Sequence, residues 1–169
     1  MLNLESLTEK VEKKLIDQFA EIDRIAHINS QKVLSAFQKY RVSDTMFAGT
    51  TGYGYDDVGR DTLDKIYAEV FGAEDALVRL QFVNGTHTIA CALFGALRPG
   101  ETLFSVTGAP YDTLQSTIGI TGNYPGSLKD FGVNYRQIEL LPNGEADLEG
   151  IVKTIKEDKT ISTVLIQRS

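Results

Sequence analysis

The second half of the chain alternates between strand-like and helical patterns, and this alternation constrains the fold more than any other feature. Apolar runs bounded by turn residues predict strands at 76–82, 102–107, 133–140 and 161–167. Apolar residues at helical spacing predict helices at 86–97, 112–118 and 147–157. Repeated strand–helix–strand units favour right-handed crossovers. We therefore expect an α/β fold with helices flanking a mostly parallel sheet.

The first part of the chain follows a different pattern. Apolar side chains recur there in steps of three, four and occasionally seven, at residues 4, 7, 11, 15, 19, 22, 26, 33, 37 and 40. This stripe predicts one long amphipathic helix, or two helices broken near 27–29. We therefore divide the chain into a helical segment at 1–45 and an α/β part at 46–169. The α/β part opens with a loop at 47–56 and a helix between Asp57 and Gly72.

Composition and charge exclude several classes of protein. The net charge of −6 and a pI of about 4.9 argue against nucleic-acid binding, which needs a concentrated basic face. The single cysteine, Cys91, excludes an internal disulfide, fits a reducing compartment and is expected to be buried and inert. The chain has neither a secretory signal at its start nor an apolar run long enough to cross a bilayer. We expect a cytoplasmic protein with no membrane partner.

The turn Asn84-Gly85-Thr86-His87 joins a predicted strand to a predicted helix. Ligands of α/β proteins bind at the carboxyl ends of strands, where helix N-termini present free N–H groups. The turn therefore predicts a phosphate or carboxylate held by the amides of 85–87, with His87 either bonding to that anion or capping the helix. A glycine that serves only the geometry of the turn is the alternative. The chain contains neither GxGxxG nor GxxxxGK[ST], so the dinucleotide and P-loop fingerprints are absent.

Tyr111 occupies the equivalent position after the next predicted strand, in TGAPYDTL. An anion cradle beside an aromatic plate suits a planar ring that carries a phosphate, although Tyr111 alone fits a half-buried core residue equally well. Two adjacent acids, Asp56 and Asp57, lack further ligands for a metal and are better explained as a helix N-cap. We expect no metal site.

Two segments resemble a known family: NGTHTIACALFGALRPGETLFSVTGAPYDTL and TGYGYDDVGRDTLDKIYAEVFGAEDALV. They are similar to pyridoxal-phosphate enzymes of the aspartate-aminotransferase fold (fold type I), and within it to the methionine gamma-lyase / cystathionine beta-lyase-like branch labelled "aluminium resistance protein". The likeness covers essentially the whole chain, as the N-terminal part of a protein more than twice as long. On this basis 46–169 is the first part of the large, cofactor-binding domain.

The resemblance implies pyridoxal 5'-phosphate as cofactor and assigns roles to individual residues. Gly85 and Thr86 match the phosphate-binding turn, with His87 next to it. Tyr111 matches the tyrosine that stacks on the pyridine ring and assists proton transfer. The segment bearing Tyr53, Tyr55 and Arg60 resembles the loop that reaches a neighbouring subunit's phosphate, which implies a homodimer or homotetramer with a cross-subunit active site. The family's Tyr-x-Arg spacing is missing here, so which tyrosine serves stays open.

The family's Schiff-base lysine and pyridinium-contacting aspartate lie beyond residue 169. The resemblance thus implies a pyridoxal-phosphate-dependent carbon–sulfur lyase that acts on a sulfur-containing amino acid, with this chain inactive by itself. Two alternatives remain from the residues alone. One is an α/β protein that binds a phosphorylated ligand without Schiff-base chemistry, and the other is a non-catalytic interaction module that works through its N-terminal helix.

Overall fold

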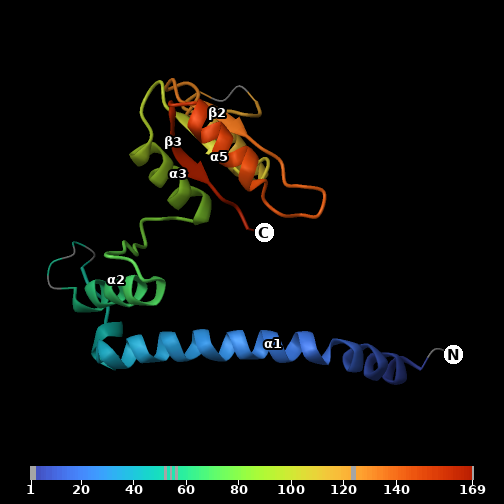
Figure 1. Cartoon of the computed structure of the whole chain (residues 1–169). Coiled ribbons are helices and arrows are strands. Elements are labelled where there is room, and N and C mark those ends of the chain that lie inside the picture. Colours follow the sequence, from blue (N-terminus) through green and yellow to red (C-terminus); the bar gives the residue numbers. More distant parts are fainter. Residues whose placement is uncertain (1–2, 52, 54, 56, 123–124, 169) are drawn as a thin grey trace. The chain divides into compact units, whose positions relative to one another are not determined.

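The computed structural model describes residues 3–51, 53, 55, 57–122 and 125–168. The chain forms two compact units, Met1–Leu80 and Gln81–Ser169 (Figure 1). The boundary between the units therefore lies further along the chain than the division at 45/46 that the sequence suggested. The long N-terminal helix shares its unit with the next helix, and the sheet belongs to the second unit.

A single 36-residue helix, α1 (Leu4–Lys39), begins the first unit. Its N-terminus is capped by the Asn3 side chain, which accepts a hydrogen bond from the Ser6 amide over 3.4 Å. The break considered near 27–29 does not occur, and the prediction of one long helix is confirmed. A short 3-10 helix, η1 (Asp44–Phe47), follows.

The second helix, α2 (Val58–Phe71), has the ends that the sequence predicted. The Asp57 carboxylate accepts the Arg60 amide over 3.0 Å, and Gly72 ends the helix with a φ of 66°. Helix α2 packs on the last turns of α1, where Ala36 is buried. A 2.6 Å ion pair joins Lys39 to Glu69 there, raising the pKa of Lys39 and lowering that of Glu69.

The strand predicted at 76–82 is wrong, because this segment has no strand assigned to it. The Val78 amide donates to the Asp64 carboxylate over 2.8 Å and not to a neighbouring strand, while Arg79 contacts the same carboxylate over 2.7 Å. The Leu80 side chain is 98% exposed. The alternating pattern alone could not supply the partner strand that sheet pairing requires.

The second unit contains a three-stranded parallel sheet in the order β2-β1-β3. Its strands are shorter than the predicted ones, and its helices match the predictions within one residue at each end. The elements are α3 (Gly85–Ala96), β1 (Thr102–Ser105), α4 (Asp112–Ile118), β2 (Asn134–Gln137), α5 (Leu148–Glu157) and β3 (Ile161–Leu165). The parallel α/β arrangement predicted from the alternation is confirmed.

Strand β1 lies at the centre of the sheet, and all four of its residues are buried. Leu103 packs into a cluster with Leu93 of α3, Leu97 at the C-cap of α3, and Leu114 and Ile118 of α4. Phe104, also fully buried, takes the opposite face because side chains alternate along a strand. Helices α3 and α5 lie on either side of β3 (Figure 1). Burying each of these two large side chains contributes about 1.5–3 kcal/mol, so β1 fixes the positions of the loops that leave it.

Helix α3 exposes much of its apolar surface, Cys91 included. Cys91 is exposed on α3 and not buried, so the expectation for this residue is wrong. Helix α3 is apolar on most of its surface, and only the face carrying Leu93 and Leu97 meets the core. Within the part of the chain that is described, no helix is both long and apolar enough to cross a membrane.

Candidate functional site

The N-terminus of α3 presents two backbone donors that no described residue accepts. Asn84 caps the helix by taking the His87 amide on its side-chain oxygen at 2.8 Å and the Thr88 amide on its carbonyl at 3.1 Å. The amides of Gly85 and Thr86 have no acceptor within 3–51, 53, 55, 57–122 and 125–168. Unsatisfied N–H groups at a helix N-terminus, together with the helix dipole, form a site suited to an anion.

Gly85 has no structural need to be glycine. It does not adopt a positive φ, and a Cβ added to it would meet nothing within 4 Å. In a helix the Cα–Cβ bond tilts toward the N-terminus, the direction in which the free amides also point. A side chain at position 85 would therefore enter the space in front of these donors. Glycine therefore leaves the space in front of the two amides open, and this geometry is compatible with a bound anion.

Thr86 joins this turn to Tyr111. The Thr86 hydroxyl lies 3.2 Å from the Tyr111 hydroxyl and 3.1 Å from the Thr113 hydroxyl. Tyr111 is half-buried, packs against the core cluster and stands at the N-cap of α4. The structure thus brings together two residues that sequence analysis placed in one site from separate loops.

A chain of hydrogen bonds holds the backbone of Tyr111. Its amide donates to the Gln167 side-chain oxygen over 3.1 Å, and the Gln167 amide in turn donates to the Thr107 hydroxyl over 3.0 Å. Sequence reasoning did not single out Thr113 or Gln167. Gln167 lies two residues after the end of β3, so the rule that ligands bind at the carboxyl ends of strands would have pointed to it.

The His87 side chain contacts the residues that precede the turn. Its Nδ1 accepts the Val83 amide over 3.2 Å, and its ring meets Phe82 edge-on with 6.2 Å between centroids. Because Nδ1 accepts, the proton of the neutral imidazole is on Nε2. Of the two roles expected for His87, the geometry matches the one of supporting the start of the helix.

The three residues proposed to reach a neighbouring subunit belong to the first unit. Tyr53 and Tyr55 are 82% and 85% exposed. Arg60 lies in the first turn of α2, where its guanidinium contacts the Asp61 carboxylate at 3.2 Å. Asp56, the other acid considered for a metal or a cap, lies outside the described residues. Among the residues that are described, no three His, Cys, Asp or Glu side chains gather into a metal-binding group.

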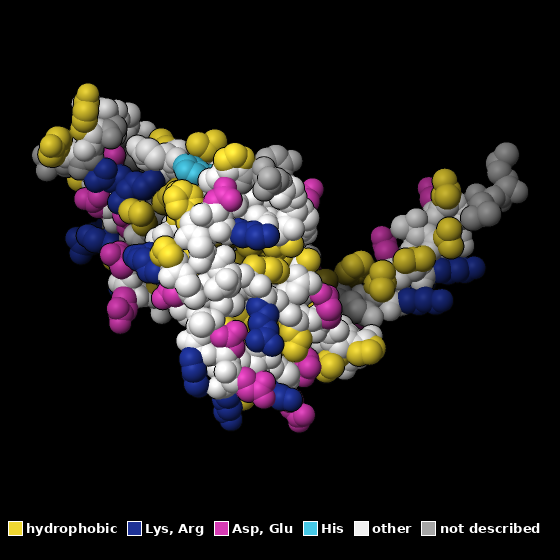
Figure 2. Space-filling model, turned by 90° about the horizontal axis from the view of Figure 1, so that it is seen from above, with side chains coloured by type: hydrophobic (Ala, Val, Ile, Leu, Met, Phe, Trp, Pro, Cys, Tyr) yellow, Lys and Arg dark blue, Asp and Glu magenta, His cyan; other side chains and the backbone are white. Residues whose placement is uncertain are grey.

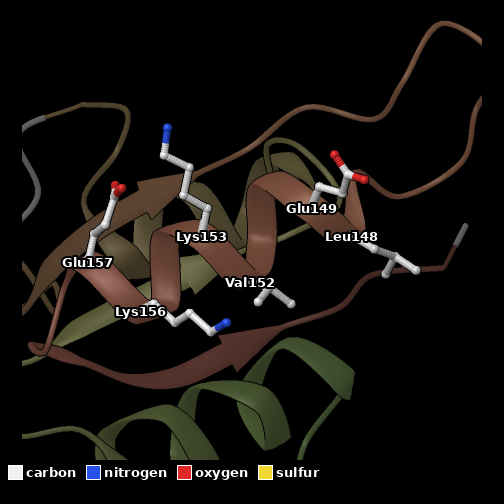
Figure 3. Close-up of a pocket in the computed structure, with 6 residues that line it drawn as sticks. All are labelled: Leu148, Glu149, Val152, Lys153, Lys156 and Glu157. Atoms are coloured by element: carbon white, nitrogen blue, oxygen red, sulfur yellow. The ribbon is translucent and has the colours of Figure 1, made fainter.

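A surface hollow of about 600 Å³ lies on α5 and contains none of the predicted site residues. It is lined by Leu148, Glu149, Val152, Lys153, Lys156 and Glu157. Figure 3 shows these side chains pointing in different directions and not toward a common centre. The hollow has no convergent polar groups, and the start of α3 remains the candidate site.

Comparison with known proteins identifies relatives over nearly the whole chain. The family model described as methionine gamma-lyase matches residues 4–169. A carbon–sulfur lyase involved in aluminum resistance from Clostridium novyi NT has 53% identity and a TM-score of 0.91, over 97% of this chain and 40% of that one. A candidate cystathionine beta-lyase involved in aluminum resistance from Listeria innocua has 48% identity and a TM-score of 0.89, over 100% of this chain and 41% of that one.

A Bacillus subtilis protein of uncharacterised function, YnbB, is 44% identical over 98% of this chain and 39% of its own length. The chain therefore spans about two fifths of the length of the relatives that it matches. The match extends across both units, from the long helix to the last strand.

Proposed function

This chain belongs to the methionine gamma-lyase family, and on that premise we propose that it forms part of the active site of a pyridoxal-phosphate-dependent carbon–sulfur lyase acting on a sulfur-containing amino acid. The names of the relatives from Clostridium novyi and Listeria innocua support the lyase class. The observation that carries the cofactor proposal is the 3.2 Å contact between the Thr86 and Tyr111 hydroxyls, beside two backbone amides without an acceptor.

The donors at the start of α3 fit the phosphate of this cofactor. The amides of Gly85 and Thr86 would take two of its oxygens, and the Thr86 hydroxyl is placed to donate to a third. No side chain at position 85 obstructs the approach. When bound, the cofactor supplies an electron sink that weakens bonds at the substrate's α-carbon.

Tyr111 would contact the cofactor ring from the next loop. Its hydroxyl is held by Thr86, and its backbone is held by Gln167, so the phenol has a fixed position before any ligand arrives. A fixed phenol can both stack on an aromatic ring and hold a proton near it. We assign Thr113 to the same cluster, since the Thr86 hydroxyl contacts the hydroxyls of both Tyr111 and Thr113.

The other groups that the proposed reaction needs come from outside the turn at the start of α3. We propose that the Schiff-base lysine lies outside residues 1–169, and that Tyr53 or Tyr55, with Arg60, serves the phosphate of a neighbouring subunit in a dimer or tetramer. The chain alone is then expected to bind pyridoxal phosphate reversibly and to release no 2-oxo acid from cystathionine or methionine. Turnover by the isolated chain would contradict the assignment of the lysine.

Calorimetric titration of the 169-residue chain with three ligands tests the binding proposal: pyridoxal phosphate, pyridoxal and inorganic phosphate. We expect pyridoxal phosphate to bind most tightly, because only it uses both the donors and the phenol. Thr86→Ala should weaken the binding of both pyridoxal phosphate and inorganic phosphate. Tyr111→Ala should weaken the binding of pyridoxal phosphate and pyridoxal but leave the binding of inorganic phosphate nearly unchanged.

Thr117→Ala is the matched control, because the Thr117 hydroxyl donates to the Thr113 carbonyl of its own helix and, among the described residues, makes no hydrogen bond to Thr86 or Tyr111. This variant should bind all three ligands like the wild type. If pyridoxal phosphate bound no better than inorganic phosphate, and Tyr111→Ala changed nothing, the chain would instead be a binder of other phosphorylated ligands. Binding of none of the three would favour an interaction module.

A further inference from the structure

The backbone amide of Tyr111 is bound by a side chain from a distant segment of the sheet unit. Tyr111 is the N-cap of α4, and the amides at the start of a helix have no acceptor inside that helix. The Gln167 side chain supplies the acceptor at 3.1 Å. A backbone N–H can only donate, so the accepting atom is the side-chain oxygen of Gln167 and not its nitrogen. The contact therefore fixes the orientation of the Gln167 amide group.

Gln167 is itself bound by the loop that leads from β1 to α4. Its backbone amide donates to the Thr107 hydroxyl over 3.0 Å, and the residue is half-buried. Just before the loop, the Val106 amide donates to the Leu165 carbonyl over 3.0 Å and extends the pairing of β1 with β3. Gln167 thus contacts both ends of the loop at 107–111, Thr107 through its backbone and Tyr111 through its side chain.

The other hydrogen bonds that join this loop to the strands lie at its start. The Gly108 amide donates to the Ile138 carbonyl over 2.9 Å, and the Ser105 hydroxyl donates to the Gly108 carbonyl over 2.6 Å. Among the described residues, the Tyr111 amide has no acceptor other than the Gln167 oxygen. The end of the loop that carries the phenol is therefore joined to the sheet through Gln167.

The position of the phenol matters because general electrostatic attraction of an anionic ligand is weak. The chain carries a net charge of −6, and Figure 2 shows Lys and Arg side chains interspersed with Asp and Glu side chains on the face in view. Affinity for a phosphorylated ring then depends on directed contacts. Two aromatic rings stack only when their centroids lie within about 4.5–7 Å of each other, so a displaced phenol loses the contact.

We propose that Gln167 is a positioning residue that sets the affinity of the site for the pyridine ring, through its contact with the Tyr111 amide. This role rests on the pyridoxal-phosphate site proposed above. The phosphate donors are the free amides of Gly85 and Thr86 on α3, and Gln167 makes no hydrogen bond to α3 among the described residues. Loss of the Gln167 oxygen should therefore weaken binding of the ring and spare binding of the phosphate.

Calorimetric titration of two variants tests this separation. Gln167→Met keeps the length of the side chain but replaces the acceptor oxygen by a weakly accepting thioether, whereas Gln167→Glu keeps an oxygen at the same position. For Gln167→Met the Kd for pyridoxal should rise by about fivefold, and the Kd for inorganic phosphate should stay unchanged. Gln167→Glu should bind pyridoxal like the wild type, since this ligand has no phosphate for the new carboxylate to repel. Normal pyridoxal binding by Gln167→Met would overturn the proposal.

A double-mutant cycle with Tyr111→Ala tests whether Gln167 acts through the phenol. Pyridoxal phosphate is the ligand for this cycle, because the donors on α3 keep its binding measurable when the phenol is absent. In the Tyr111→Ala background, Gln167→Met should raise the Kd no further. An equal rise in both backgrounds would show that Gln167 acts independently of Tyr111, and the proposed role would be wrong.

Gln137→Met is the matched control. Gln137 ends β2, on the other side of β1 from β3, where it accepts the Tyr135 hydroxyl over 2.7 Å and donates to Glu139 over 2.5 Å. This variant loses side-chain hydrogen bonds of the same kind at the end of a strand, without a contact to Tyr111. Its Kd values for pyridoxal phosphate, pyridoxal and inorganic phosphate should equal those of the wild type.

Hydrogen exchange of the Tyr111 amide, measured by NMR on the unliganded chain, gives a readout that needs no ligand. Exchange should be roughly tenfold faster in Gln167→Met than in the wild type, and unaltered in Gln167→Glu and Gln137→Met. Unchanged exchange in Gln167→Met, in a wild type that binds pyridoxal phosphate, would refute the role of Gln167 alone. A wild type that does not bind pyridoxal phosphate would refute the proposed function and, with it, this role.

Discussion

Replacing Gly85 with alanine should make the chain more stable and its anion binding weaker. The two effects follow from the same observation, since an added Cβ meets no atom within 4 Å and the backbone at this position needs no positive φ. Alanine in a compatible position stabilises a protein by about 0.4–1 kcal/mol, because the unfolded chain loses conformational freedom. With an m-value of about 2 kcal/mol/M, the urea midpoint should rise by about 0.2–0.5 M.

The expected loss of anion binding is steric and occurs in the space in front of the free amides. A methyl group at position 85 would occupy the space through which the phosphate approaches the Gly85 and Thr86 N–H groups. Losing one charge-assisted hydrogen bond costs about 1.5–3 kcal/mol. The Kd for pyridoxal phosphate and for inorganic phosphate should therefore rise by at least about tenfold, the equivalent of 1.4 kcal/mol. Calorimetric titration and urea unfolding of the same preparation measure both quantities.

Gly95 offers a control within the same helix. A Cβ there also meets nothing within 4 Å, and the residue lies near the other end of α3. Gly95→Ala should raise the free energy of unfolding in the same direction and leave both Kd values unchanged. If Gly85→Ala lowered stability, the glycine would have a structural role that the geometry does not reveal. Unaltered phosphate binding by this variant would show that the anion site is not at this turn.

Three further predictions concern stability and reactivity. Ser105→Ala should lower the free energy of unfolding by about 1–2 kcal/mol in urea titrations, because the fully buried hydroxyl donates over 2.6 Å to a buried carbonyl that would lose its partner. Burial opposes ionisation of Asp64, yet the Val78 amide and a neighbouring guanidinium hold the pKa of Asp64 below its ordinary value. The stabilisation from Asp64 is thus present above the unfolded-state pKa of about 3.9 and is lost as pH falls through the lower folded-state pKa. Asp64→Asn should therefore lower the free energy of unfolding at pH 7 and reduce its dependence on pH on the acid side. An unchanged pH profile would contradict this role of Asp64. Cys91 should react with a thiol reagent in the folded state, at a rate that denaturant raises only slightly, whereas release of the thiol only on unfolding would show it to be buried.

The parts of the fold that sequence predicted well depend on local signals. Helix α2 begins after Asp57 and ends at Gly72 because a carboxylate can accept the free amides at a helix start and glycine can adopt a left-handed backbone at its end. The bounds of α4 were predicted at the same residues that the structure shows, 112–118. Caps of this kind involve residues only a few positions apart, so a single sequence contains the information.

The failures depend on contacts between distant segments. The run at 76–82 has a strand-like composition, but a strand forms only beside another strand, and the Val78 amide binds a carboxylate instead. Cys91 was expected to be buried because it lies about one turn into an apolar helix face, but α3 is apolar on most of its surface. Which face of such a helix becomes buried is decided by the packing of Leu93 and Leu97 on the sheet, which periodicity does not determine.

The candidate site was predicted in part. The rule for strand ends placed Gly85 and Tyr111 together, although the strand before Gly85 does not form. The start of α3 and the loop after β1 are enough to bring the two segments close to each other. Gln167 was missed because its role depends on β3 pairing beside β1, which puts the Gln167 side chain next to the Tyr111 amide and the Gln167 amide next to Thr107. The position of the phenol is thus fixed by three segments of the sheet unit that are far apart in sequence. A helix start with free amides can arise from one turn, whereas the position of an aromatic ring beside it depends on the assembled sheet. For this reason the neighbourhood of Thr86 and Tyr111 was easier to predict than the contact of Gln167 with the Tyr111 amide.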